Sequence, residues 1–323
     1  MNIRPRINRW TKARRDLNFD ISIKSSLVQP HFVVGGEGID EPISSMPGIN
    51  RQSVDKLLDT ISKDMKMGIN SHMIFPVLDS KDKDSYATNA SNPDMPLQIL
   101  VKKLKSLYGG DIVIMTDVCL CTATDHGHCG IIHDEEINNE MSVSELCKIA
   151  LSHAVAGADY VSASDMMDGR ILAIREVLES EGFVKTGILS YSVKYASSFY
   201  GPFRDAACSA PSFGDRGSHQ MDIRSGYQEA ILEAVTDEGE GADIIMIKPA
   251  LSYLDIIKSA SENFNIPVFA YQVSGEYSMI KAAAEKEWIN ETKAIYESLI
   301  SIKRSGASGI LTYFAKEVAK NLN

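Results

Sequence analysis

Short apolar runs recur along this chain, and amphipathic stretches separate them. The run 242–247 carries five apolar side chains in six positions without alternation, which is typical of a strand buried on both faces. Comparable runs end in Gly, Pro or polar residues, as strands do. Eight strands are predicted in this way, at 27–34, 71–77, 111–118, 159–164, 187–194, 242–248, 267–273 and 309–314.

The stretches between the runs show the periodicity of helices. Leu57, Ile61 and Met65 lie on one face of a predicted helix, and Ser142 and Glu145 have the spacing of a capping box before another. Strands that alternate with helices over nearly the whole chain predict a (β/α)₈ TIM barrel of the α/β class. A doubly wound open sheet is the alternative, but no Gly-rich turn from strand to helix supports a dinucleotide site.

Two segments do not follow this alternation. Residues 1–26 are basic and lack a sustained apolar period, so we expect an extended N-terminal arm, anchored by Trp10, that lies on a partner subunit. The catalytic barrel domain would then cover 27–323. Residues 201–221 are rich in Gly, Pro, Ser and Arg without a period, which predicts a mobile lid.

Composition limits the partners of such a domain. Of the 323 residues 44% are apolar, enough for a packed core, and the formal net charge of −10 argues against nucleic acid as a partner. No apolar run approaches the length of about 18 residues that a membrane span needs. The basic opening segment lacks the apolar core and cleavage site of a secretory signal. We therefore expect a cytoplasmic protein.

A lysine stands at the end of the run 242–248, directly before Pro249. Proline ends the strand there, and it places the ammonium of Lys248 at the mouth of the barrel. A lysine against apolar surroundings has a lowered pKa, and its neutral amine can form a Schiff base with a carbonyl substrate. The alternative is a head group that reaches into water. Lys194 ends the preceding predicted strand, and two such lysines facing one cavity would lower each other's pKa, which favours a Schiff-base site.

Other polar side chains also stand at strand ends. In a barrel of this type, the loops that follow the strands form the active face. The side chains that end predicted strands three to eight are Asp117, Ser164, Asp165, Lys194, Lys248, Ser274 and Tyr313. We expect them to line one site.

Three of the five cysteines, Cys119, Cys121 and Cys129, fall within eleven residues, which is the density of a metal site. Three thiolates around one Zn²⁺ leave a fourth position for water or substrate, the open geometry of a catalytic zinc. Two alternatives remain open. One is a structural zinc completed by His126 or His128, and the other is a redox-active group of cysteines.

Charged residues mark the predicted lid and the helix that follows it. Arg204, Arg216 and Gln220 lie in or beside the lid, where arginines suit bidentate capture of a substrate carboxylate. Solvated surface charge is the alternative interpretation. Glu233 and Asp237, four residues apart on a predicted helix, could share a Mg²⁺, although such a pair more often forms a solvated helix face.

Five motifs together resemble those of the porphobilinogen synthase family, also called 5-aminolevulinate dehydratases. The resemblance runs from about residue 4 to the end of the chain, and the motifs are long and specific. They are DVCLCTATDHGHCG at 117–130, SDMMDGR at 164–170, KYASSFYGPFRDA at 194–206, MIKPA at 246–250 and YQVSGEY at 271–277.

The resemblance implies a lyase that condenses two molecules of 5-aminolevulinate to porphobilinogen with loss of two waters, a step in tetrapyrrole (heme) biosynthesis. It implies that Lys248 forms the Schiff base with the first-bound substrate and that Lys194 assists or forms a second imine. Ser274 and Tyr313 match residues that hold the carboxylate of this substrate. Asp117 and Ser164 match residues near its amino group.

For the second substrate, the resemblance implies a clamp formed by Arg204, Arg216 and Gln220. It also assigns a catalytic zinc to the cysteines at 119, 121 and 129, where the ion would polarise the carbonyl of that substrate as a Lewis acid. Some members replace these cysteines with an aspartate-rich set, whereas this sequence keeps all three.

Glu233 and Asp237 match an allosteric Mg²⁺ site found in many bacterial-type members. Members are commonly homo-octamers in which the N-terminal arm wraps a neighbour, a role that residues 1–26 fit. Two other classes of protein account for part of the pattern. A class I aldolase would need the lysine and not the thiolates, and a non-catalytic metal-binding protein would need the thiolates and not the lysines.

Overall fold

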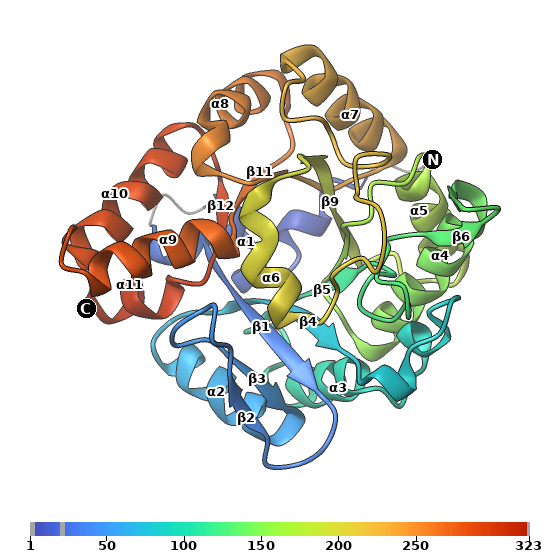
Figure 1. Cartoon of the computed structure of the whole chain (residues 1–323), viewed down its shortest axis with the longest axis horizontal. Helices are drawn as coiled ribbons and strands as arrows, with labels where there is room; N and C mark the ends of the chain where they lie inside the picture. The colour runs from blue at the N-terminus through green and yellow to red at the C-terminus, as the bar shows by residue number, and fades with distance from the viewer. Residues whose placement is uncertain (1–3, 20–22, 322–323) are drawn as a thin grey trace.

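The computed structural model describes residues 4–19 and 23–321 of the chain. Within them, eight parallel strands close into a barrel with helices around it (Figure 1). The strand order is β1, β4, β5, β8, β9, β10, β11, β12, and β12 pairs back with β1. The strands are β1 Leu27–Val34, β4 Ser71–Val77, β5 Val113–Val118, β8 Tyr160–Ala163, β9 Gly187–Lys194, β10 Ile244–Lys248, β11 Val268–Gln272 and β12 Gly309–Thr312. The predicted (β/α)₈ barrel is confirmed, and each strand end lies within two residues of its expected position.

The remaining elements cover the barrel or extend its loops. Two short antiparallel hairpins, β2–β3 and β6–β7, follow β1 and β5. Their strands are β2 Asp40–Pro42, β3 Asn50–Ser53, β6 Ile131–His133 and β7 Glu136–Asn138. The helices are α1 Lys12–Phe19, α2 Val54–Lys66, α3 Pro96–Tyr108, α4 Asn139–Ala156, α5 Arg170–Ser180, α6 Gly201–Ala206, α7 Tyr227–Glu240, α8 Leu254–Asn263, α9 Ser274–Glu285, α10 Glu291–Arg304 and α11 Ala315–Asn321. Among the described residues, no helix is both long and apolar enough to cross a membrane.

The start of α4 differs from the predicted capping box. The helix begins at Asn139, and its cap lies four residues before the predicted one, because the side chain of Asn138 accepts a hydrogen bond from the backbone N–H of Met141. Ser142 therefore lies inside the first turn. Its hydroxyl donates to the backbone carbonyl of Asn138 and accepts from the N–H of Ile131, so it links the helix to β6 instead of capping it.

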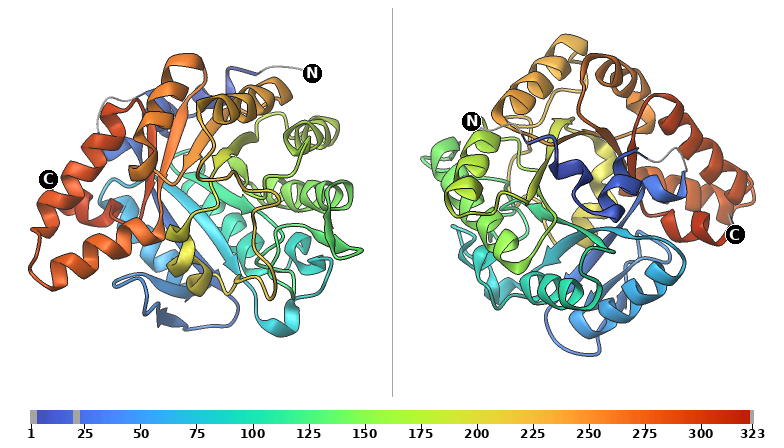
Figure 2. Two further views of the ribbon diagram at one scale, coloured as in Figure 1. Left: turned by 45° about the horizontal axis from the view of Figure 1, so that its top comes forward. Right: turned by 180° about the vertical axis from the view of Figure 1, so that it is seen from behind.

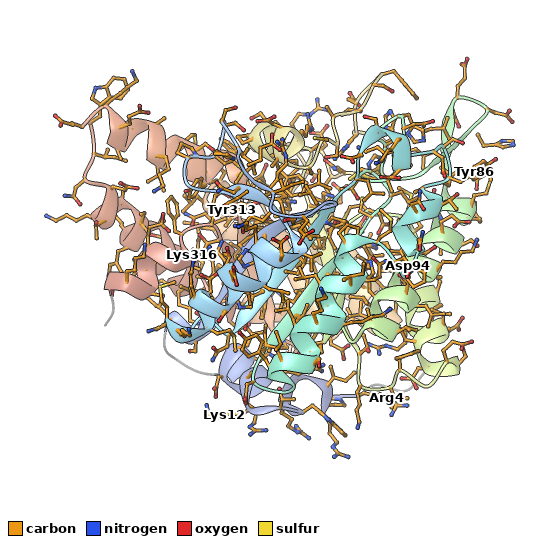
Figure 3. The ribbon with its side chains drawn as sticks, turned by 90° about the horizontal axis from the view of Figure 1, so that it is seen from below. Arg4, Lys12, Tyr86, Asp94, Tyr313 and Lys316 are labelled. Atoms are coloured by element: carbon orange, nitrogen blue, oxygen red, sulfur yellow. The ribbon has the colours of Figure 1, made fainter. Side chains whose placement is uncertain are left out.

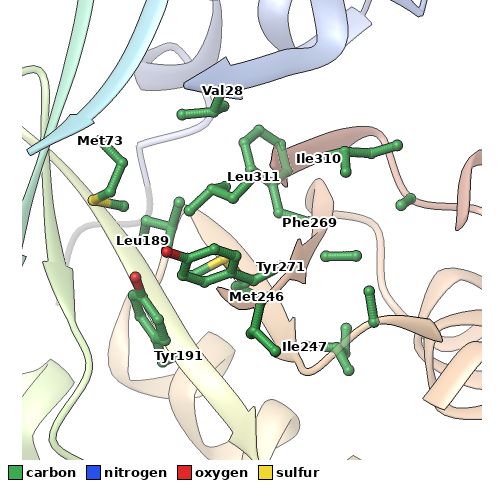
Figure 4. Packing of buried hydrophobic residues seen from close by; sticks show 14 of the residues in the cluster. Val28, Met73, Leu189, Tyr191, Met246, Ile247, Phe269, Tyr271, Ile310 and Leu311 are labelled. Carbon is green, nitrogen blue, oxygen red and sulfur yellow. The ribbon is translucent and has the colours of Figure 1, made fainter. Parts of the chain in front are cut away.

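Apolar side chains from several strands meet in one buried cluster (Figure 4). Gly309 makes room in this cluster, because a Cβ at its position would lie 2.4 Å from the ring of Phe269. The packing is continuous from strand to strand, which gives the strand ends a rigid support. The labelled members of the cluster include Val28, Met73, Leu189, Met246, Phe269 and Leu311.

Part of the predicted arm covers the amino-terminal end of the barrel, as the view from behind shows (Figure 2). Ile7 and Leu17 are buried there, and the side chain of Asn8 donates to the backbone carbonyl of Asp243 at 2.8 Å. Arg14 is also buried, and its guanidinium lies 4.8 Å from the centre of the Tyr160 ring. The described part of residues 1–26 is thus compact and packs on its own barrel, in contrast to the expected extended arm.

Ion pairs complete the packing at this end. Arg14 lies 3.0 Å from Asp159, and Lys105 lies 3.0 Å from the other oxygen of the same carboxylate. Asp159 also accepts a hydrogen bond from the N–H of Ile114, at the start of the strand next to its own. These groups are largely buried and paired in charge, so they neutralise one another away from water, although the Nε of Arg14 has no hydrogen-bond partner among the described residues.

The predicted lid lies over the opposite, carboxyl-terminal end of the barrel, where α6 crosses the mouth (Figure 1). Its first six residues form α6, with Pro202 in the first turn, and the rest of 201–221 is irregular. The hairpin β2–β3 holds this helix from outside. Arg51 donates to the backbone carbonyls of Asp205 and Ala206 at 2.7 and 2.8 Å, and Ser45 donates to the side chain of Asp205.

Candidate active site

The two strand-end lysines face the same cavity. Lys248 on β10 is the register partner of Lys194 on β9, and paired residues of neighbouring parallel strands point to the same side of a sheet. The register shifts between Ile245 and Ile247, which aligns the two lysines at the strand ends. Both are buried, with exposed fractions of 5% and 4%. Strand pairing alone therefore places two amines in one pocket.

Aromatic rings surround the amine of Lys248. Its Nζ lies 4.7 Å from the ring centre of Tyr271, 4.9 Å from that of Tyr200 and 5.0 Å from that of Phe203. Burial lowers the pKa of Lys248 to about 7, and the charge of Lys194 adds to this effect. Both causes of the lowered pKa were expected from the sequence, and burial contributes more than the charge of Lys194. A large share of the amine is therefore neutral and nucleophilic near neutral pH.

Asp117, at the end of β5, supplies the opposite charge. Burial raises its pKa to about 6, while a hydrogen bond with Ser164 and the charges of Lys194 and Lys248 act in the opposite direction. The ammonium of Lys194 donates a hydrogen bond to the backbone carbonyl of Ser164, the residue after β8. Four predicted site residues from four strand ends are thus joined electrostatically.

A small cavity lies between these residues and the lid, with a volume of about 20 Å³. This volume accommodates about one water molecule, so a substrate enters only when the residues above the lysines move. The lining contains six predicted site residues together with Cys121 and three aromatic rings. It consists of Asp117, Ser164, Lys194, Arg204, Arg216 and Lys248, with Cys121, Phe75, Tyr200 and Phe203.

The three cysteines of the loop after β5 meet beside this cavity. Their sulfur atoms all lie within 4.8 Å of one another, with Cys119 and Cys121 at 3.3 Å, and all three residues are buried. Neither His126 nor His128 belongs to this group. Instead, the ring of His128 bonds the backbone carbonyl of Phe213. The donor set fits a soft or borderline ion held by three thiolates.

Arg216 ties the lid to the cysteine loop. Its guanidinium donates to the backbone carbonyls of Gly127 and Ser209 at 3.0 and 2.6 Å, which leaves its Nε without a partner among the described residues. Gln220 is buried, and in the described part of the chain both polar atoms of its amide are unpaired. Buried unpaired donors are costly, so these groups are suited to a bound polar ligand.

Ser274 and Tyr313 do not line the small cavity. The hydroxyl of Ser274 accepts a hydrogen bond from the backbone N–H of Phe203 in α6, at 2.9 Å. The hydroxyl of Tyr313 is 2.8 Å from that of Tyr271. Both side chains therefore stand next to groups that cover or surround Lys248, where a movement of the lid would free them for a ligand.

The structure separates the predicted magnesium pair. Asp237 is buried, and both of its oxygens are bonded, one to the guanidinium of Arg170 at 3.0 Å and the other to Arg170 and Ser190. Glu233 instead lines a wider cavity of about 770 Å³ between the lid, the cysteine loop and β7. Glu233 and Asp237 are therefore not two free carboxylates, because the ion pair with Arg170 occupies both oxygens of Asp237. This wider cavity contains neither lysine, so it is not where the amine chemistry takes place.

The sequence interpretation missed the residues that hold Lys248 in place. The aromatic residues near its amine lie within the five motifs, but no pattern in the sequence assigns them a role. Glu276 lies within the motif at 271–277, but no role is predicted for it. It accepts from the N–H of Val273, at 2.6 Å, and it also accepts from the N–H groups of Ala250 and Leu251. Its carboxylate thereby fixes the turn directly after Lys248, a role that no local pattern signals.

A closed parallel barrel that buries paired lysines beside a group of three thiols defines a barrel enzyme with a candidate nucleophilic amine and a candidate metal centre. Comparison with known proteins agrees with this class. The family model described as delta-aminolevulinic acid dehydratase matches residues 2–321. The chain belongs to this family, which confirms the family assignment made from the motifs. It is accordingly a lyase with the porphobilinogen synthase activity of that family.

Individual relatives match over nearly their full length. The delta-aminolevulinic acid dehydratase of Methanothermus sociabilis is 48% identical over 317 residues, covering 98% of this chain and 97% of the relative. The enzyme of the same name from Bacillus subtilis is 44% identical, covering 97% and 95%. A crystal structure of the porphobilinogen synthase of Toxoplasma gondii, in complex with the reaction product porphobilinogen, superimposes with a TM-score of 0.90 at 45% identity, covering 99% and 91%.

Proposed function

We propose that this protein condenses two molecules of 5-aminolevulinate to porphobilinogen, releasing two waters, with Lys248 as the nucleophile. The observation that carries the proposal is the meeting of Lys248, Lys194 and Cys121 around one cavity at the carboxyl-terminal end of the barrel. The relatives that match the full chain, and the neighbour with bound porphobilinogen, support the same reaction.

Lys248 begins the reaction as a neutral amine. Its nitrogen attacks the ketone carbon of the first substrate, and loss of water gives the imine. The pKa of about 7 makes the neutral form available without a separate base at the site. Asp117, with its pKa of about 6, lies close enough to accept or return protons during this step.

Lys194 and the lid complete the environment of the reaction. The ammonium of Lys194, held by the Ser164 carbonyl, keeps a positive charge beside the imine. Arg204 and Arg216 reach the cavity from the lid, and their planar forks suit the carboxylate of the second substrate. Gln220, which lines the neighbouring wider cavity, would add its unpaired amide to this clamp when the lid moves.

Ser274 and Tyr313 would bind the carboxylate of the first substrate. In the closed arrangement the Ser274 hydroxyl accepts from the N–H of Phe203, and the Tyr313 hydroxyl pairs with that of Tyr271. A carboxylate could replace these partners when α6 moves away, because hydroxyl groups donate readily to a negative charge.

The metal that fits the cysteine group is Zn²⁺. Cys119, Cys121 and Cys129 would hold it through three thiolates, and the ion when bound would supply Lewis-acid polarisation of the second substrate's carbonyl. Cys121 is the member of the group that lines the cavity, so an ion held by this group would lie near the lysines. Arg216, through Gly127, links closure of the lid to the shape of the same loop.

Mg²⁺ and the homo-octamer have less support. Glu233 remains a candidate Mg²⁺ contact, but Asp237 does not fit as its companion while Arg170 binds both of its oxygens. An octamer is supported by large apolar side chains on the surface, such as Leu232 and Trp288, which are 66% and 74% exposed. Light scattering of the full-length chain should give a mass eight times that of the 35.5-kDa protomer.

Trapping with borohydride tests the function and its rivals together. With 5-aminolevulinate present, reduction should attach one substrate to Lys248, and product should form only when the cysteine group holds its metal. The Cys119→Ser, Cys121→Ser, Cys129→Ser triple variant should still trap substrate and make no porphobilinogen. A class I aldolase would be indifferent to the cysteines, and a non-catalytic metal-binding protein would trap nothing. Either result would overturn the proposal.

A further inference from the structure

A second buried group of metal-binding side chains lies outside the barrel, away from the lysines. His31 is on β1, His72 is on the neighbouring strand β4, and Asp64 is in the last turn of α2. Their exposed fractions are 5%, 0% and 1%. Lys316 of α11 is labelled in Figure 3, and its Nζ lies 3.4 Å from Asp64 Oδ2.

Strand pairing and helix packing bring the three side chains together. Val33 and Ile74, each two residues beyond one of the histidines, belong to the apolar cluster under α2. Because side chains alternate along a strand, His31 and His72 face the same helix. No spacing in the sequence connects positions 31, 64 and 72, so the motifs alone do not predict a site there.

The distances in this group suit a single ion. His31 Nε2 lies 3.0 Å from His72 Nδ1 and 3.6 Å from Asp64 Oδ2, and the three ligand atoms are all within 4.8 Å of one another. Two nitrogens that are each about 2.1 Å from one ion stand about 3.0 Å apart when they bind at a right angle. A modest shift of side chains would place all three atoms around one ion.

The protonation states also suit a cation. Burial lowers the pKa of His72 to about 3 and that of His31 well below its usual value, so both rings are neutral, the form that binds metal. Burial raises the pKa of Asp64 to about 6, which leaves the carboxylate ionised at neutral pH. Within the described residues, Asp64 Oδ2 accepts no hydrogen bond of good geometry, although it is paired in charge with Lys316.

Lys316 is the group that a metal ion would have to replace. Its ammonium provides the counter-charge of the buried Asp64 carboxylate, and it would repel a cation at the same position. The side chain is 29% exposed, whereas those of Asp64 and His31 are 2% and 4% exposed. A long, partly exposed lysine can turn its head group into water with little loss of packing.

We propose that His31, His72 and Asp64 bind one divalent transition-metal ion in exchange for the ammonium of Lys316, which turns into solvent. Two imidazoles and one carboxylate select borderline ions such as Zn²⁺, Co²⁺ or Ni²⁺ over Mg²⁺, which prefers oxygen ligands. The ion joins β1, β4 and α2, so it stabilises the barrel wall. This site shares no ligand with the cysteine group and does not depend on the proposed function.

Titration with Co²⁺ tests this site directly. The full-length chain without an affinity tag, carrying the cysteine triple variant described above, removes the competing thiolates. We expect calorimetry to show one Co²⁺ per chain, with visible ligand-field bands and no near-ultraviolet thiolate band. We also expect the melting temperature to rise with Co²⁺ concentration, since the ion binds the folded state alone.

Two substitutions of the ligands should remove the binding. Asp64→Asn keeps the shape of the side chain, and Asp64→Asn or His72→Gln should lower the affinity by about 10-fold or more. His153→Gln is the matched control, because His153 is a buried histidine on α4 whose pKa is also lowered to about 3 and which lies outside the group. It should leave Co²⁺ binding unchanged.

Lys316→Met tests the exchange itself. Removing the competing ammonium should tighten Co²⁺ binding by about 10-fold, the opposite direction to the ligand variants. Circular dichroism would confirm that each variant is folded. The proposal is overturned if the triple variant binds no Co²⁺, if Asp64→Asn and His72→Gln bind it as tightly as their parent, or if Lys316→Met weakens the binding.

Discussion

The two ends of the barrel treat buried charge in opposite ways. At the amino-terminal end, Arg14 and Lys105 share the carboxylate of Asp159, and Arg175 pairs with Asp243. Each buried ion there has a partner in direct contact, and backbone groups supply further hydrogen bonds. This end of the barrel is closed and electrostatically balanced.

At the carboxyl-terminal end the balance is missing. Two lysines and two arginines line the small cavity, and among the described residues that line it Asp117 is the one carboxylate. Burial, together with the charge of Lys194, lowers the pKa of Lys248 to about 7, whereas the buried charges at the other end are held in pairs. The comparison teaches that uncompensated burial, more than burial itself, marks the functional end of this fold.

Replacing the nucleophile should produce the largest effect and should break the comparison most clearly. Lys248→Met is expected to lower turnover by about 10⁴-fold or more. It should also raise the free energy of unfolding by about 1 to 2 kcal/mol, because it removes a buried amine that burial and the charge of Lys194 both disfavour in its protonated form. Product assays and denaturant titrations measure the two effects. Lys258→Met on the surface of α8 is the control and should change neither. A marked loss of stability in Lys248→Met would contradict the view that the buried charge at this end is uncompensated.

At the amino-terminal end, we expect a loss of stability without a loss of turnover. Asp159→Ala leaves Arg14 and Lys105 without their shared partner and should cost about 3 to 5 kcal/mol of unfolding free energy. Turnover per folded molecule should stay close to that of the parent. Glu145→Ala, which breaks an exposed pair with Lys148, is the matched control and should cost about 0.5 kcal/mol or less. An equal, small cost in both variants would show that the amino-terminal pairs are not needed.

The lid arginines should have an intermediate effect. Arg216→Ala is expected to raise KM by about 10- to 100-fold, because the variant loses a bidentate contact with the second substrate and a link to the cysteine loop. Steady-state kinetics measure the change, and borohydride trapping of the first substrate should persist. Arg224→Ala, in an exposed pair with Asp222, serves as control. If KM were equal in the two variants, the clamp would be excluded.

The smallest effect is a shift of the pH profile. Burial lowers the pKa of Lys248 to about 7, so the neutral amine predominates above that pH, and imine formation should fall by up to about tenfold per unit below it. Lys194→Met removes a like charge, so it should raise the pKa of Lys248 and move this acidic limb to higher pH by about one unit. Single-turnover borohydride trapping across the pH range measures the acidic limb of the parent and that of Lys194→Met. If the two limbs superimpose, Lys194 does not act on the charge of Lys248.

Continuous apolar runs made the barrel predictable, because short runs without alternation, bounded by Gly or Pro, are typical of strands buried on both faces. The strand-end lysines followed from the same runs. The amino-terminal helix α1 was not predictable, since Ile7, Ala13 and Leu17 give too few apolar positions for a period and buried polar groups provide the rest of the packing. Asp237 was predicted as a metal ligand because no local pattern shows that Arg170, 67 residues earlier, already binds it.

The reactive side chains of the site were predicted more fully than the residues that surround them. The lysines, the cysteines and Asp117 belong to motifs whose residue types have few alternative uses. The aromatic rings around Lys248 and the carboxylate of Glu276 act through packing between distant segments, and apolar or capping residues look alike wherever they occur in a sequence. Contacts of this kind arise only when the strand ends converge.

The hydrogen bonds of Arg51 to α6 bear on the rate of product release. Arg51 and Ser45 grip the end of α6 from a hairpin more than 150 residues earlier in the chain, above a cavity of about 20 Å³. A product built from two substrates cannot leave until these hydrogen bonds break and α6 moves. The lifetime of these contacts, which lie away from the reacting atoms, would then set how long each product stays bound. The making and breaking of covalent bonds would not set it.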